Sequence, residues 1–158
     1  MAKEKNRMRY LRILAIEDDE ERLAIFNTWL SAYSSGDLAI RLVCAQSAGQ
    51  AMGVISRDSG RTFAGLMLDH DLEKNVKAST DLQLSGSDLI SKILISIKRD
   101  VPILVHSMNL QMGPEMAKRL EKAGYNVTYV PFKDLNAEKF NDWFEYVKDL
   151  WDDFCEGE

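Results

Sequence analysis

The chain has 158 residues, of which 46% are hydrophobic and 28% charged, a size and composition that predict one globular domain with a full core. Its formal net charge of −5 argues against general nucleic-acid binding through phosphate neutralisation. The two cysteines, Cys44 and Cys155, form no disulfide framework and have no metal-ligand spacing, which favours a reducing, cytoplasmic location. Behind the basic N-terminus no apolar stretch is long enough for a signal peptide or a membrane span.

Short apolar runs alternate with amphipathic stretches along the chain. The apolar runs predict five strands, over Ile13–Ile16, Leu38–Ala45, Phe63–Leu68, Val101–Val105 and Val127–Val130. The amphipathic stretches predict five helices, over about residues 20–32, 47–57, 87–99, 114–124 and 136–154. Such alternation predicts an α/β fold, a parallel sheet covered by helices on both faces, as a single domain with its core at about residues 12–154.

Polar residues gather where three of the predicted strands end. The first strand runs into Glu17-Asp18-Asp19-Glu20, the third into Asp69-His70-Asp71, and the fourth into His106-Ser107-Met108-Asn109. The only two histidines of the chain lie at two of these ends. In open parallel sheets ligands bind beyond the carboxyl ends of the strands, so we expect these side chains to line one crevice.

The carboxylates at these ends predict a metal site. Several carboxylates held together repel one another, and a hard divalent cation such as Mg²⁺ or Mn²⁺ relieves that repulsion. The expected ligands are Asp18, Asp19 and Asp69, with Glu17 or Asp71 assisting. The alternative is a solvated acidic cluster without a metal.

These residues resemble the receiver domain of two-component signalling. The run Ile13–Glu20 resembles the first receiver strand with its acidic residues, and Leu68-Asp69 resembles the third strand with its phosphoacceptor aspartate. Ser85–Ile90 is similar to the glycine-led helix that follows, and Ser107 stands where receivers carry a switch serine or threonine. The resemblance implies a flavodoxin-like three-layer sandwich with strand order 2-1-3-4-5.

The sequence departs from ordinary receivers in three places. Val130 stands directly before Pro131-Phe132, where receivers usually have a lysine, and Lys133 lies beyond it. The span from Asp69 to Gly86 is longer than usual, which predicts a loop over the site. The two histidines have no role in phosphoryl signalling.

The departures look like a narrower relative, the cyclic-phosphate processing receiver family. Asp18-Asp19, the string Leu68–Leu72 and His106-Ser107 with Asn109 match its motifs in turn. The resemblance implies metal-assisted hydrolysis of a cyclic or terminal phosphate, such as a cyclic nucleotide or an RNA-end cyclic phosphate. Cleavage of a cyclic phosphodiester needs a base and an acid, and imidazole titrates near the working pH.

The predicted roles in that phosphoesterase follow the motifs. His70 and His106 supply acid–base chemistry beside Asp69 and Asp71, and Ser107 and Asn109 orient the phosphate. Either histidine alone would more often be a structural residue, and Asn109 more often a turn residue. Lys74, Lys77 and Lys133 are candidates for attracting anions, although exposed lysines usually bind nothing specific.

Two other functions stay open. One is a signalling receiver phosphorylated on Asp69, against which the absence of lysine at Val130 counts, because that cation normally faces the phosphoryl group. On this ground we expect little stable phosphoaspartate. The other is a non-catalytic module that binds a phosphate-bearing ligand or a protein.

Overall fold

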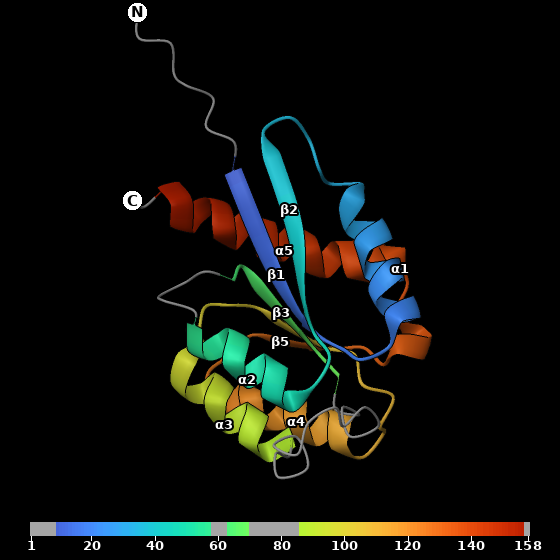
Figure 1. Ribbon diagram of the computed structural model, residues 1–158, viewed down its shortest axis with the longest axis vertical. Coiled ribbons are helices and arrows are strands. Elements are labelled where there is room, and N and C mark those ends of the chain that lie inside the picture. Colours follow the sequence, from blue (N-terminus) through green and yellow to red (C-terminus); the bar gives the residue numbers. More distant parts are fainter. Residues whose placement is uncertain (1–8, 58–62, 70–85, 157–158) are drawn as a thin grey trace, which may run out of the picture.

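Five parallel strands form one sheet in the computed structural model, which describes residues 9–57, 63–69 and 86–156 (Figure 1). The strand order is β2-β1-β3-β4-β5, as predicted for a receiver-like, flavodoxin-like fold. The strands are β1 (Arg9–Ile16), β2 (Leu38–Ala45), β3 (Gly65–Leu68), β4 (Ile103–Val105) and β5 (Val127–Tyr129). The helices are α1 (Glu20–Ser31), α2 (Ala48–Arg57), α3 (Gly86–Ser96), α4 (Met112–Lys122) and α5 (Ala137–Glu156), with a short 3₁₀ helix at Phe132–Asp134.

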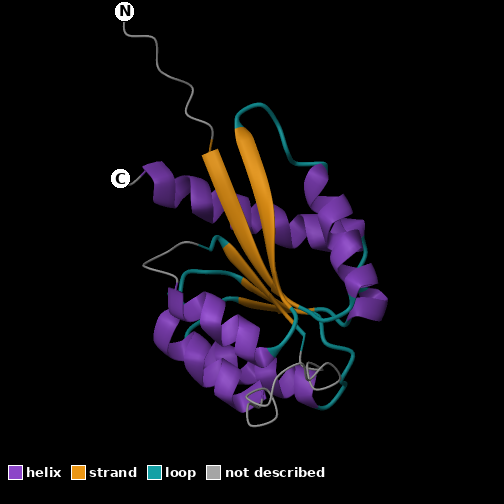
Figure 2. Cartoon of the chain, viewed as in Figure 1, coloured by secondary structure: helices purple, strands orange, loops and turns teal. Residues whose placement is uncertain are grey.

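The helices form two layers around the sheet (Figures 1 and 2). Helices α1 and α5 cover one face, where they pack on Ile13, Ala15 and Met67. Helices α2, α3 and α4 cover the other face, where they pack on Leu14, Ile16 and other strand residues. Successive side chains of a strand point to opposite faces, so strands buried on both sides need the continuous apolar runs that this sequence has. None of the described helices is long and apolar enough to cross a membrane.

Strand β1 begins four residues before the predicted start at Ile13. Its first residues pair with β2 alone, from Arg9 opposite Leu38, whereas pairing with β3 starts at Ile13 opposite Gly65. Figure 1 shows β1 and β2 extending beyond the other strands. Because Arg9 and Tyr10 are exposed in this two-stranded part, hydrophobic patterning could not indicate it.

Side-chain caps and one glycine set the helix ends. The Ser47 hydroxyl accepts a hydrogen bond from the Gln50 amide (3.1 Å), and the Asn136 carbonyl oxygen accepts one from the Lys139 amide (2.9 Å). In each case the side-chain oxygen satisfies a free amide of the first helical turn. After α4, Gly124 has φ of 103°, the left-handed conformation in which glycine terminates helices.

Candidate functional site

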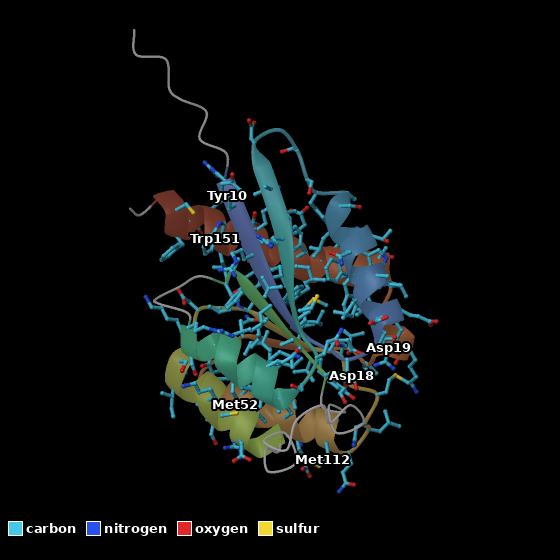
Figure 3. The ribbon with its side chains drawn as sticks, viewed as in Figure 1. Tyr10, Asp18, Asp19, Met52, Met112 and Trp151 are labelled. Carbon is cyan, nitrogen blue, oxygen red and sulfur yellow. The ribbon has the colours of Figure 1, made fainter. Side chains whose placement is uncertain are left out.

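The carboxyl ends of β1, β3 and β4 lie side by side at one edge of the sheet. The Asp69 amide donates to the Ile16 carbonyl (2.9 Å), and the His106 amide donates to the Leu68 carbonyl (3.0 Å). These bonds continue the sheet pairing just past the strands and bring residues 17–19, 69 and 106–107 together. Figure 3 shows Asp18 and Asp19 at this edge, where the strands converge. The convergence expected from the sequence is therefore observed.

Three carboxylates form a compact acidic group here. One oxygen from each of Glu17, Asp18 and Asp69 lies within 4.8 Å of the other two. Glu17 and Asp69 are buried, and Asp18 is half-buried. An all-oxygen, negatively charged donor set at this spacing fits a hard cation such as Mg²⁺. These three residues would hold it.

The pKa values of two of these carboxyl groups are raised by their surroundings. Burial raises the pKa of Glu17 to about 7, although Asp69 and Arg22 act in the opposite direction. Burial and then the negative charge of Asp69 raise the pKa of Asp18. Both shifts show that the negative charge gathered here is poorly solvated, which is the condition that a bound cation relieves.

Asp19 plays a different part from the predicted one. Its carboxylate caps α1 by accepting hydrogen bonds from the amides of Glu21 (2.9 Å) and Arg22 (3.2 Å). It is exposed and lies outside the compact acidic group. Glu17 instead takes the third place in that group. The sequence motif is thus displaced by one residue: the acidic pair beside Asp69 is Glu17-Asp18 rather than Asp18-Asp19.

Arg22 is a site residue that the sequence analysis missed. Its Nη1 atom lies 3.6 Å from Glu17 Oε1 and 3.8 Å from Asp69 Oδ2. Its guanidinium also lies over the Phe132 ring, 4.6 Å from the centroid. One feature of the sequence could have indicated it. Arg22 lies in the first turn of the helix after the acidic run, and the helix dipole makes a positive side chain unfavourable at that position.

His106 is a buried partner of Glu17. Its Nε2 atom lies 2.8 Å from Glu17 Oε2, and its side chain is 0% exposed. The Phe26 ring meets the imidazole edge-on at 5.1 Å between centroids. Burial lowers the pKa of His106 to about 4, so the imidazole is neutral at physiological pH. We predicted an acid–base catalyst facing a phosphate, but a ring without exposed surface cannot exchange protons directly with a substrate.

Ser107 and Asn109 organise the turn between β4 and α4. The Ser107 hydroxyl is buried and accepts a hydrogen bond from the Asn109 amide (3.1 Å). The Asn109 side-chain oxygen accepts bonds from the amides of Gln111 (3.1 Å) and Met112 (2.8 Å). Asn109 is half-buried and acts as a turn residue just before α4, and the phosphate contacts expected of both side chains stay predictions.

The remaining predicted residues divide into two sets. His70, Asp71, Lys74 and Lys77 lie outside the described residues. Lys133 is exposed on the 3₁₀ helix, where its amide donates to Met108 Sδ (3.3 Å). Val130 packs against the apolar cluster under α5, and its amide donates to the Val105 carbonyl (3.0 Å).

No protein-family model and no curated protein matches the chain. Solved structures match its fold. The Vibrio cholerae chemotaxis protein CheY4 shares 15% identity over 88% of this chain and 99% of its own, with a TM-score of 0.59. The phosphorylated cyanobacterial phytochrome response regulator RcpA shares 18% identity over 90% and 91%, with a TM-score of 0.58. The Caulobacter crescentus pilus assembly protein CpaE shares 11% identity over 87% and 90%, with a TM-score of 0.54.

These similarities establish the class of fold. The chain has the fold of response-regulator receiver domains, with five parallel strands in the order 2-1-3-4-5. The same fold occurs in a chemotaxis protein, a phytochrome response regulator and a pilus assembly protein. Fold alone does not carry one activity, so the function has to be argued from the site.

Proposed function

We propose that this protein is a receiver-type phosphoryl acceptor, in which Asp69 takes a phosphoryl group from a small phosphodonor or a phosphorylated partner protein. The observation that carries the proposal is the position of Asp69. It directly follows the central strand β3, and its carboxylate lies within 4.8 Å of those of Glu17 and Asp18. A nucleophilic carboxylate next to a cation-binding pair is the arrangement that phosphoryl transfer to an aspartate requires.

The proposed step is a simple displacement. An Asp69 carboxylate oxygen attacks the phosphorus atom of a donor such as acetyl phosphate. The bond between phosphorus and the acetyl oxygen breaks, and acetate leaves with the electron pair. A bound Mg²⁺ would neutralise the carboxylates and polarise the phosphoryl oxygens. Glu17 and Asp18 would hold the cation, and the buried position of Asp69 would restrict access of water to the acyl phosphate.

Hydrolysis of a cyclic phosphate is the second candidate, carried by the sequence string Leu68-Asp69-His70-Asp71-Leu72. That reaction needs an acid and a base in contact with the substrate. His106 is fully buried against Glu17, so its imidazole cannot touch a substrate as one of the two expected acid–base groups. His70 alone would have to serve. We therefore rank this activity below phosphoryl acceptance and treat it as an outcome of the same experiment.

The test is to incubate the protein with acetyl phosphate and Mg²⁺ and to measure intact mass. We expect an added phosphoryl group on the parent and on Asp153→Asn, a control at an exposed aspartate of α5. Asp69→Asn should gain none. Parallel samples receive 2′,3′-cyclic nucleotides and Mg²⁺. Hydrolysis that Asp69→Asn or His70→Ala abolishes, together with no phosphoryl gain on the parent, would replace this proposal with the phosphoesterase.

A further inference from the structure

Receivers place a lysine before the proline that follows β5, and this chain has Val130 there. A phosphoryl group on Asp69 would bring additional negative charge to a region that already holds three carboxylates. Without a nearby cation from the protein, that charge would be opposed only by the metal. The described part of the site contains one such cation, and it comes from a different element, helix α1.

Arg22 lies between the acceptor and its acidic neighbour. Its Nη1 atom is 3.8 Å from Asp69 Oδ2 and 3.6 Å from Glu17 Oε1. Both distances exceed those of well-formed hydrogen bonds between charged groups, which are about 2.7–2.9 Å. At these distances the positive charge of the guanidinium still stabilises the two carboxylates. Its N–H groups do not form short hydrogen bonds with them. Its side chain is 22% exposed, so it also borders the solvent side of the site.

Two contacts hold the guanidinium in this position. At one end, the Arg22 backbone amide donates to the Asp19 carboxylate, and Arg22 Nε lies 3.8 Å from Asp19 Oδ2. At the other end, the guanidinium stacks on Phe132, whose amide donates to the His106 carbonyl (3.0 Å) at the end of β4. Phe132 follows Pro131 directly after Val130. The aromatic residue two positions after Val130 thus supports an arginine that belongs to helix α1.

We propose that Arg22 performs the charge-neutralising role that receivers assign to the missing lysine, by donating hydrogen bonds to the phosphoryl oxygens on Asp69. This inference rests on the proposed function of Asp69 as a phosphoryl acceptor. A planar guanidinium offers several donors in a fixed fork that matches phosphate oxygens. In the metal-free protein the same group neutralises Glu17 and Asp69. The absence of lysine at Val130 therefore does not argue against phosphoryl acceptance.

The test uses beryllofluoride, a stable analogue of a phosphoryl group, and measures its affinity in the presence of Mg²⁺. Arg22→Ala should weaken beryllofluoride binding by about 10- to 100-fold, the loss expected for one or two charged hydrogen bonds. Arg22→Lys keeps the charge without the fork and should recover part of that affinity. The matched control is Arg12→Ala, which removes an arginine stacked on another aromatic ring, Phe63, at 4.9 Å. It should bind as the parent does.

Affinity for Mg²⁺ alone separates this role from a purely structural one. Removing a cation from a carboxylate cluster should leave Mg²⁺ binding equal or tighter, because less positive charge competes for the same oxygens. Arg22→Ala is thus expected to weaken beryllofluoride binding without weakening Mg²⁺ binding. Parallel loss of both would show that Arg22 only positions the carboxylates, and would overturn the inference.

The remaining outcomes are also decisive. If the parent captures beryllofluoride and Arg22→Ala captures it equally well, Arg22 has no phosphoryl role, although Asp69 remains an acceptor. If the parent captures none with Mg²⁺ present, the proposed function itself fails and this inference fails with it. Thermal unfolding of each variant establishes that the protein is folded, and Arg22→Lys supplies the comparison if Arg22→Ala does not fold.

Discussion

At the scale of single residues, the pair formed by Glu17 and His106 is the most unusual feature of the site. Both side chains are fully buried, and they meet at 2.8 Å. Burial favours the neutral form of each, which raises the pKa of Glu17 to about 7 and lowers that of His106 to about 4. The hydrogen bond between them stabilises the fold, because a buried polar group without a partner is costly.

The pair predicts an unusual dependence of stability on pH. The Glu17 pKa rises from 4.5 to about 7 on folding, so its contribution to stability is lost as pH rises through that range. The His106 pKa falls from 6.5 to about 4, so its contribution is lost as pH falls from 6.5 towards 4. The two slopes oppose each other between about pH 4.5 and 6.5, and we expect the free energy of unfolding of the parent to vary little there.

Glu17→Gln should reveal how the titration of His106 alone changes the free energy of unfolding with pH. With the Glu17 titration removed, stability should rise between about pH 4.5 and 6.5, by about 1–2 kcal/mol. Urea denaturation across this range, with Glu115→Gln on α4 as a control, provides the measurement. A free energy of unfolding that falls with rising pH in Glu17→Gln would contradict the assignment of these two shifts.

At the scale of elements, the Asp19 carboxylate caps helix α1 and lies outside the compact acidic group. Asp19→Ala should lower the free energy of unfolding by about 1 kcal/mol, the usual cost of losing a side-chain cap. The stabilisation that Mg²⁺ confers should be retained, because Asp19 lies outside the compact acidic group. Asp18→Asn is the matched comparison and should lose most of the Mg²⁺ response. Equal loss in both variants would return Asp19 to the list of metal ligands.

Strand β3 and helix α5 meet at a glycine. A Cβ atom on Gly65 would lie 3.0 Å from Ile13 Cδ1 and 3.1 Å from Trp143 Cη2, closer than carbon atoms normally pack. Gly65→Ala should therefore force this contact apart and destabilise the fold by about 1–3 kcal/mol, as overpacking of cores does. Chemical denaturation measures the change. Gly36→Ala is the control, because nothing lies within 4 Å of the added atom there.

At the scale of the whole molecule, the acidic group exists only in the folded chain. Its members come from residues 17–18 and from residue 69, which meet because β1 pairs with β3. A cation that binds this group therefore binds the folded state and stabilises it by mass action. A net charge of −5 adds a weak general attraction for cations but no site of its own.

Mg²⁺ should accordingly raise the melting temperature of the parent. At a concentration one hundred times its dissociation constant the gain is about 2.7 kcal/mol, which corresponds to several degrees for a domain of this size. Asp69→Asn should abolish the increase, whereas Asp153→Asn should keep it. Differential scanning calorimetry with and without Mg²⁺ measures the effect. A variant lacking Asp69 that responds as the parent does would show that the cation binds elsewhere.

The architecture, and the edge of the sheet at which the site lies, could be predicted from the amino-acid sequence. Parallel strands covered by helices on both faces require apolar runs, and the amphipathic helices between them require their own periodicity, so both patterns are visible in the chain. Polar residues directly after three of those runs indicated Asp69 and the neighbouring acids. Each of these conclusions depends on local sequence and on a general rule about where strands end.

Which side chains face one another depends on contacts between segments that lie far apart in the chain. Glu17, Asp18 and Asp19 are consecutive, and a shift of one residue changes the direction of every side chain near a strand end, so spacing could not separate a ligand from a helix cap. Arg22 is held at the site by its contact with Phe132, on the 3₁₀ helix that follows β5, more than one hundred residues away in sequence. Burial of His106 depends on Phe26 and Glu17 closing around it, and no local pattern encodes that enclosure.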